Sequence, residues 1–433
     1  MSTGPRRVVV TGMGVCSAAG FDIKMFWERL VAGAACARHI RRFDTSGFPS
    51  RIAAEIDDAE FRQAYDLSDE WRLRGQIAQY GAAAVGQAIK DACLTPASAP
   101  PDRIGVSMAA GMGSYDHEEV FGPCGTGARL SPDPTVDWPA LYDAMRRMLK
   151  PRMTERRTPG AISAHIANER EFRGPAMSVM TACAGGTQAI GDAMNWIRSG
   201  RADIVVAGGA DSELYPMGLA SFCLLGALSR RNDSPTTASR PFDADRDGFV
   251  MGEGAGAIVL EELGHATARG ARIYAEAAGF GSACDAYRVT DPHPDGLGAR
   301  LAMTRALRNA AVTTDEVEYV NAHGTSTMAN DRIESMALAQ IFGDRAKRVP
   351  VSSTKSMIGH ATVAAGAIEA IVMALTLTTG TVHPTINQDR QDPNCDLDYV
   401  PNHARRVNVG IAVSNSFAFG GQTASLVLRR YEG

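Results

Sequence analysis

The sequence has little that marks membrane, secreted or nucleic-acid-binding proteins. Its apolar stretches are short, and "AIEAIVMALTL", among the longest, is interrupted by Glu369. The opening "RRVVVTGMGV" is broken by Gly12 and Gly14, which predicts a first strand and its turn rather than a signal peptide. The formal net charge is only −4 over 433 residues, which argues against a nucleic acid or a membrane surface as partner. We expect a cytoplasmic protein.

Motifs for metals, disulfides and nucleotides are also missing. None of the eight cysteines forms a Cys-x-x-Cys pair, so we expect scattered, mostly reduced thiols and no metal site. "DADRDG" begins like a calcium loop, but its twelfth position is Gly254, and Glu253 lies one residue short. The glycines of "TGMGVCSAAG" and "GEGAGA" lack the acidic partner of a nucleotide fingerprint. We therefore expect no cofactor.

Short β-branched runs alternate with helical patterns, which predicts an α/β protein. Strands are expected at 6–12, 103–109, 176–182, 202–209 and 256–263, and helices at 72–93, 186–198 and 361–378. A similar alternation returns after about residue 270, so we expect two related halves, 1–265 and 266–433. Residues 122–160 are rich in Pro, Gly and Arg and predict an inserted excursion on the surface or at a subunit contact.

Cys183 follows a short apolar run and precedes a helical pattern. A thiol at a helix N-terminus lies in the positive end of the helix dipole, which lowers its pKa. Gly185 and Gly186 leave room for a bulky electrophile, and the backbone amides there could hold an oxyanion. Most cysteines are small buried hydrophobes, so from this stretch alone nucleophile and core residue are equally good interpretations.

Two histidines have similar settings. His323 follows a strand in "YVNAHGTST", and His360 precedes a helix in "SSTKSMIGHATVAAG". Each alone could be structural, but ligand-binding groups gather at strand exits in α/β proteins, so we expect both to meet Cys183 in one pocket. Without an acid to orient them they make a poor protease triad. A thiolate that takes an acyl group, with two neutral imidazoles that stabilise an enolate, suits carbon–carbon bond formation. Lys355 and Glu369 are expected to form a supporting ion pair.

Several blocks together resemble a known family. "TACAGG", "VNAHGTST", "SSTKSMIGHATVAAGAIEA" and "SNSFAFGG" look like the signatures of the β-ketoacyl-ACP synthases, most closely the elongating synthase II type. "ASRPFDADRDGFVMGEGAGAIVLEE" and the N-terminus are similar too, so the likeness covers nearly the whole chain. It implies a thiolase fold, with two similar α/β halves in five αβαβα layers, normally as a dimer, and acyl carrier protein as partner.

The resemblance also implies roles for single residues. Cys183 matches the acylated nucleophile, and His323 and His360 match the pair that decarboxylates malonyl-ACP; Lys355 and Glu369 match the charged pair. The remaining matches are a structural acid, Glu334; the pantetheine-binding Thr325 and Thr327; the gating Phe419, whose N–H joins that of Cys183 in the oxyanion hole; and the further substrate-contacting Phe249, Phe417, Thr290 and Met112.

The chain also departs from the synthase II pattern. Ala418 stands where those enzymes usually have glycine, which should restrict a swinging gate. Thr362 and Val363 replace a glycine-containing segment, and Asn330-Asp331-Arg332 looks more like type II polyketide ketosynthases. Met112 aligns with a position that limits chain length. We therefore expect a specialised ketosynthase that extends a polyketide or polyene chain, with housekeeping fatty acid synthesis as the alternative.

Other interpretations remain. A degradative thiolase would carry a second cysteine near 353–369, and a starter-type synthase would have asparagine in place of His360. The chain could act as a homodimer, or as the active partner of a chain-length-factor subunit that lacks the nucleophile. Arg72 and Arg74 are candidates for docking the acidic carrier protein, although a solvated helix face explains them equally well.

Overall fold

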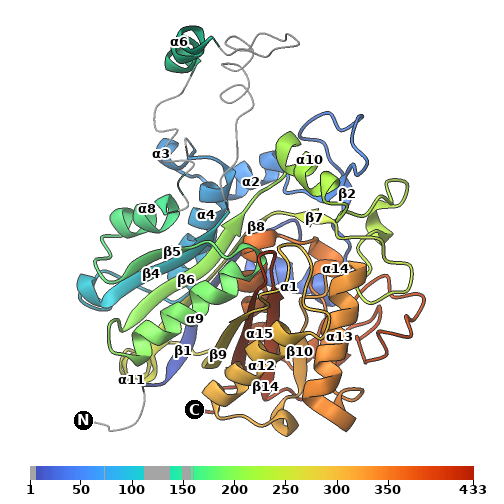
Figure 1. The fold of residues 1–433 in the computed structure, drawn as a ribbon. Helices are drawn as coiled ribbons and strands as arrows, with labels where there is room; N and C mark the ends of the chain where they lie inside the picture. Colours follow the sequence, from blue (N-terminus) through green and yellow to red (C-terminus); the bar gives the residue numbers. More distant parts are fainter. Residues whose placement is uncertain (1–5, 73, 112–136, 149–157, 159) are drawn as a thin grey trace.

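The computed structural model describes residues 6–72, 74–111, 137–148, 158 and 160–433. Ten strands form one mixed sheet (Figure 1). The N-terminal half contributes β1 (Val8–Ser17), β4 (Ile104–Ala110), β5 (Ala176–Val179), β6 (Ile204–Asp211) and β8 (Gly254–Glu262). The C-terminal half contributes β9 (Ala275–Cys284), β10 (Tyr319–Asn321), β11 (Val351–Ser352), β14 (Ile411–Phe417) and β15 (Gln422–Arg429).

The two halves repeat one topology. The N-terminal strands lie in the order β5-β4-β6-β8-β1, and the C-terminal strands in the order β11-β10-β14-β15-β9. In each half the first two pairings are parallel and the last two antiparallel. β1 and β9 join the halves through an antiparallel pairing of Val10 with Ala275. This repeat confirms the expectation of two similar α/β halves.

Helices complete five layers. α4 (Gln76–Asp91) and α8 (Ala161–Glu169) cover the outer face of the N-terminal strands; α12 (Leu297–Ala310) and α13 (Met328–Phe342) lie on the outer side of the C-terminal half. Between the halves, α9 (Gly185–Arg198) and α15 (Ala365–Thr379) contact each other and strands of both halves. The resulting αβαβα arrangement is the thiolase fold that the resemblance implied.

The central helices pack closely because glycines face them. A Cβ at Gly186 would lie 2.6 Å from the backbone N of Ala367, and one at Gly256 would lie 2.7 Å from that of Ile368. Among the described residues, Thr362–Thr379 is the one helical stretch long and apolar enough to cross a bilayer. It is a longer apolar stretch than the sequence suggested, but 89% of it is buried, so packing between the two halves of the large sheet accounts for its composition.

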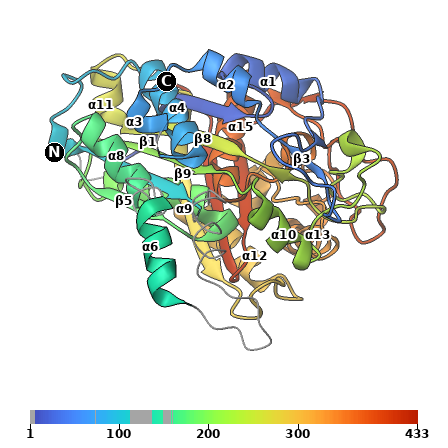
Figure 2. The ribbon, with the colours of Figure 1, turned by 90° about the horizontal axis from the view of Figure 1, so that it is seen from above.

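Smaller elements surround this core (Figure 2). The helices are α1 (Ile23–Val31), α2 (Asp58–Ala64), α3 (Asp69–Arg72), α6 (Trp138–Met148), α10 (Pro216–Leu224), α11 (Leu263–Ala268) and α14 (Lys355–Ile358). The short strands are β2 (Arg38–His39), β3 (Ile52–Ala54) and β7 (Met251–Gly252), which pair together, and β12 (Thr381–Val382) with β13 (Arg405–Arg406). In Figure 1, α6 stands apart from the other elements.

Three expected boundaries were wrong. The helix expected over 72–93 is divided into α3 and α4, because Gly75 adopts a φ of +83° at the start of α4. The strand expected over 176–182 ends at Val179, and the helix expected over 361–378 begins with a 3-10 turn, η6 (Thr362–Ala364). Of the 122–160 excursion, the structure describes 137–148, 158 and 160; the rest lies outside the described residues, as does Met112.

Candidate active site

Cys183 lies in a sharp turn between β5 and α9. The turn is a 3-10 segment, η2 (Ala182–Ala184), and Ala182 opens it with a φ of +46°. The C-terminal half repeats this geometry, since Thr362 opens η6 before α15 with a φ of +40°. A non-glycine residue in this region of φ is strained and is retained only where the surroundings fix it. The two strained turns bring the N-termini of α9 and α15 together. Cys183 lies within the first turn, and His360 lies two residues before the second.

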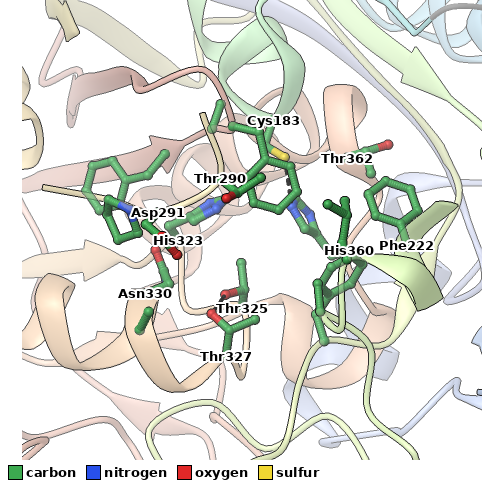
Figure 3. Close-up of a pocket in the computed structure, with 18 of the residues that line it drawn as sticks. Cys183, Phe222, Thr290, Asp291, His323, Thr325, Thr327, Asn330, His360 and Thr362 are labelled. Carbon is green, nitrogen blue, oxygen red and sulfur yellow. Dashed lines mark hydrogen bonds between the residues drawn. The ribbon is translucent and has the colours of Figure 1, made fainter. Parts of the chain in front are cut away.

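The structure brings together the three side chains singled out from the sequence (Figure 3). His360 Nε2 lies 3.1 Å from Cys183 Sγ. The rings of His323 and His360 lie 5.3 Å apart, nearly perpendicular at 85°. Cys183 therefore has one imidazole at hydrogen-bond distance and a second beside it, in the same cavity.

The backbone around each histidine is held firmly. Buried Glu334 accepts hydrogen bonds from the backbone N of His323 at 2.9 Å and of Gly324 at 2.8 Å. His360 donates its backbone N–H to the carbonyl oxygen of Val250 at 2.8 Å and accepts from Gly252 N at 3.0 Å. The main chain is thus fixed at both histidines, while the buried Nδ1 atom of each ring has no hydrogen-bond partner among the described residues.

Lys355 and Glu369 form a buried ion pair, each side chain 2% exposed. Burial and, next, the charge of Lys355 hold the pKa values of His323 and His360 well below the ordinary value of 6.5. Both imidazoles are therefore neutral near pH 7, so each has one N–H to donate and one nitrogen free to accept. Burial also raises the pKa of Glu369 to about 7, against the opposing effect of Lys355.

The thiol of Cys183 does not have the low pKa that its helix position suggested. Burial raises its pKa to about 12; Lys355 opposes this, and the charge of Asp211 adds to it. Desolvation of a thiolate outweighs the helix dipole here. Because the resting thiol and imidazole are both neutral, attack on a thioester requires transfer of the thiol proton to His360 Nε2 as the new bond forms.

The residues face a cavity of about 260 Å³. Its apolar walls are Phe222, Leu225, Ala227, Phe249, Phe417, Ala418 and Phe419, and its polar lining includes Asp285, Thr290, Asp291, Thr325, Thr327 and Asn330. The hydroxyls of Thr325 and Thr327 lie 3.0 Å apart. Sequence reasoning missed Phe222, Leu225 and Asp285, because an apolar helix such as α10 and a loop aspartate carry no local pattern that marks a cavity.

The loop after β14 closes one side of the cavity. Gly420 and Gly421 adopt φ values of +84° and +75°, whereas Ala418 is not in the left-handed region. The backbone N–H of Gly420 donates to Val289 O at 2.6 Å, so the loop is tied to the segment before Thr290. The positive-φ positions of this loop are therefore glycines, and Ala418 fits its backbone in this arrangement.

Arg72 and Arg74, the candidates for docking the carrier protein, differ in their exposure to solvent. Arg74 was a wrong choice, because its side chain is 6% exposed and pairs with Glu70. Arg72 is 51% exposed but pairs with Asp66 and Asp69. Neither is a free surface cation. Within the described ranges, no cluster of three or more His, Cys, Asp or Glu side chains could hold a metal ion.

Comparisons with known proteins agree with this geometry. Residues 5–266 match the Beta-ketoacyl synthase N-terminal domain, and residues 274–389 match the corresponding C-terminal domain. This chain belongs to the β-ketoacyl synthase family. It is a condensing acyltransferase that forms a carbon–carbon bond in extending an acyl chain on acyl carrier protein.

Named relatives match over the whole length. The 3-oxoacyl-[acyl-carrier-protein] synthase 2 of Rhizobium meliloti is 42% identical over 435 residues, which cover 99% of this chain and 100% of that protein. The enzyme of the same name from Coxiella burnetii is 40% identical over 429 residues, or 98% and 99% of the two chains.

Solved structures include a ketosynthase in complex with its type II PKS acyl-carrier protein and bound to the hexaketide. It has a TM-score of 0.87 and 33% identity, and covers 99% of this chain and 100% of its own. The ishigamide ketosynthase/chain length factor has a TM-score of 0.86 and 36% identity, with the same coverage.

Proposed function

We propose that Cys183 carries the growing acyl group and that His323 and His360 promote the decarboxylation of malonyl-ACP. The observation that supports this most is the convergence of one thiol and two neutral imidazoles in one cavity. Cys183 Sγ attacks the acyl-ACP thioester while its proton passes to His360 Nε2. The carrier thiolate then leaves and takes this proton, so His360 is neutral again. Malonyl-ACP then loses CO₂, and the imidazole N–H groups bind the enolate oxygen. The enolate carbon attacks the Cys183 thioester and the carbon–sulfur bond breaks, which releases β-ketoacyl-ACP and a Cys183 thiolate that takes up a proton.

Backbone groups and hydroxyls complete the proposed site. The N–H groups of Cys183 and Phe419 bind the oxyanion of the acyl thioester; the latter donates to no acceptor among the described residues. Thr325 and Thr327 bind the pantetheine arm, which their position on the cavity lining supports. The charge of Lys355, added to burial, keeps the histidines neutral, and Glu369 is the buried partner of Lys355.

We further propose that the chain extended is a polyketide or polyene. Ala418 in the gate and the Asn330-Asp331-Arg332 stretch support this. The likeness to a type II PKS ketosynthase and to the ishigamide ketosynthase/chain length factor supports it too. The alternative is housekeeping fatty acid synthesis, which is favoured by the higher identity, 40–42%, to the synthase 2 enzymes.

We propose a dimer that works in the cytoplasm, either with a second copy or with a chain-length-factor-like subunit. β5 is an edge strand of the large sheet, Met180 beside it is 55% exposed, and no further strand among the described residues pairs with this edge, which supports a partner there. The described cysteines are free thiols, which suits a reducing compartment.

The test is a condensation assay with purified protein, malonyl-ACP and matched acyl-ACPs, either saturated or conjugated. We expect condensation to be lost in Cys183→Ala and faster turnover of conjugated acyl groups by the parent. Condensation that survives Cys183→Ala would refute the proposed nucleophile. Equal or faster turnover of long saturated chains would support the fatty acid alternative. Analytical ultracentrifugation of the protein alone, and with a co-expressed partner subunit, decides between the two dimers.

A further inference from the structure

A buried carboxylate beside the active site has no part in the mechanism above. Asp211 is the last residue of β6 and is 1% exposed. One carboxylate oxygen accepts hydrogen bonds from the Thr362 hydroxyl and, at 3.0 Å, from Val363 N, while the other accepts from Ser212 N at 2.9 Å. A buried charge that is hydrogen-bonded so fully fixes the geometry of its donors.

The turn that Asp211 holds is the one that follows His360. Thr362 lies in the strained left-handed conformation, lines the cavity and begins η6 two residues after the histidine. In Figure 3 its hydroxyl points away from Cys183, and it donates to Asp211 rather than toward the cavity. β-branched residues rarely adopt a positive φ. The hydrogen bonds that Asp211 accepts from Thr362 and Val363 can compensate for this strain.

The corresponding corner of the other half is built differently. β14 occupies the place in its half that β6 occupies in the first, and it ends at Phe417, where Asp211 ends β6. β14 contacts the η2 turn, which carries Cys183. The gate loop, residues 418–421, follows Phe417 along the chain. One corner is thus tied by a carboxylate, while the other adjoins the loop over the cavity.

We propose that Asp211 is a positioning residue of this enzyme: by fixing the Thr362–Val363 turn, it holds His360 at hydrogen-bond distance from Cys183. The inference rests on the proposed role of His360. Asp211 also has an electrostatic effect, since its charge raises the pKa of Cys183 and so opposes Lys355. It therefore favours the protonated thiol.

Several charged groups affect the pKa values of Cys183 and Asp211. Cys183 responds to Lys355, Asp211 and Glu369, and His360 is its hydrogen-bond partner. The charge of Glu253 adds to the raised pKa of Asp211, and burial and then the charge of Asp211 raise the pKa of Glu213 to about 8. Burial raises the pKa of Asp211 to about 6, so its carboxylate is charged in an assay at pH 8.

The test compares loss of the charge with loss of one hydrogen bond. D211N keeps the shape but removes the charge and one of the two acceptor oxygens, so the rate of Cys183 alkylation by iodoacetamide at pH 8 should rise about threefold or more. T362V removes only the hydroxyl and should lower malonyl-ACP decarboxylation about tenfold, since small displacements at a reacting centre are costly. T362S restores the hydroxyl and should recover most of that rate.

D91N is the matched control. Asp91 also accepts a backbone hydrogen bond, from Met13 N at 2.9 Å, and one from the Tyr274 hydroxyl at 2.9 Å, but it lies outside the cavity lining. D91N should lower thermal stability and leave the rate of Cys183 alkylation at pH 8 unchanged. If D211N and T362V behave like D91N, Asp211 is merely structural and the inference is wrong. If the parent does not decarboxylate malonyl-ACP, the proposed function fails, while the alkylation rate of D211N still tests the role of Asp211. Should D211N not fold, T362V and T362S decide the matter.

Discussion

The ion pair between Lys355 and Glu369 permits a sharp test of how the site is stabilised. Both side chains are 2% exposed, with no solvent to replace a lost partner. Glu369→Leu leaves a buried ammonium and should lower the free energy of unfolding by about 3–5 kcal/mol. Replacing both, by Lys355→Met with Glu369→Leu, substitutes apolar groups of similar size and should stay within about 2 kcal/mol of the parent.

Lys355→Met should be milder than Glu369→Leu and should depend on pH. The carboxyl that remains has a pKa already raised to about 7 by burial, and loss of Lys355 raises it further. Its folded pKa then exceeds its unfolded value of about 4.3. The folded form binds the proton more tightly, so stability is greatest in acid and falls as the pH rises through 7. The variant should therefore lose more stability at pH 8 than at pH 6.

Urea unfolding followed by circular dichroism, at both pH values, measures these differences. The coupling energy is the sum of the two single effects minus that of the double variant. Single effects that simply add would refute the argument, because the two charges would then not depend on each other. The double variant should fold yet condense poorly, since its histidines no longer face the buried cation.

Other predictions concern the rest of the site. His360→Ala and His323→Ala should each lower condensation by at least about a hundredfold, measured with malonyl-ACP; parent-like rates would contradict their roles. Gly186→Ala places a Cβ against the backbone of Ala367 and should cost about 1–3 kcal/mol in urea unfolding; unchanged stability would show that α9 and α15 can separate freely. Ala418→Gly should speed turnover of saturated acyl-ACPs if the gate is restricted, and an unchanged rate would leave Ala418 without that role.

Much of the architecture could be predicted because it depends on local patterns. Buried strands read as β-branched runs, and Cys183 and His360 stand at strand-to-helix steps that are visible in the sequence. The split at Gly75 and the 3-10 turn at Thr362 were missed, because a single backbone angle decided each of them. Periodicity describes which face is buried and not where the chain turns.

The electrostatics of the site were harder to predict. A cysteine at a helix N-terminus suggested a lowered pKa, but the turn also buries the thiol and brings Asp211 near it. Likewise, Arg74 looked like a surface cation in a polar stretch and proved to be buried. Both errors have one cause: burial is a property of the packed chain, and desolvation can exceed any effect that is local in sequence.

The duplicated fold explains how one site can combine a turn that carries the reactive thiol beside a loop with a second turn that is held rigidly. Two equivalent turns meet at the centre, each with a strained residue, Ala182 or Thr362, at its start. One carries the thiol and adjoins the gate loop, where an acyl chain has to enter; the other is tied to Asp211 and carries no reactive group on its helix start. Because the topology is the same, the difference between a reactive corner and a rigid corner comes from a few side chains. If this is correct, exchanging Asp211 for alanine should free the rigid corner without disturbing the sheet, and the loss should appear both in acyl transfer to Cys183 and in decarboxylation, because both steps use His360.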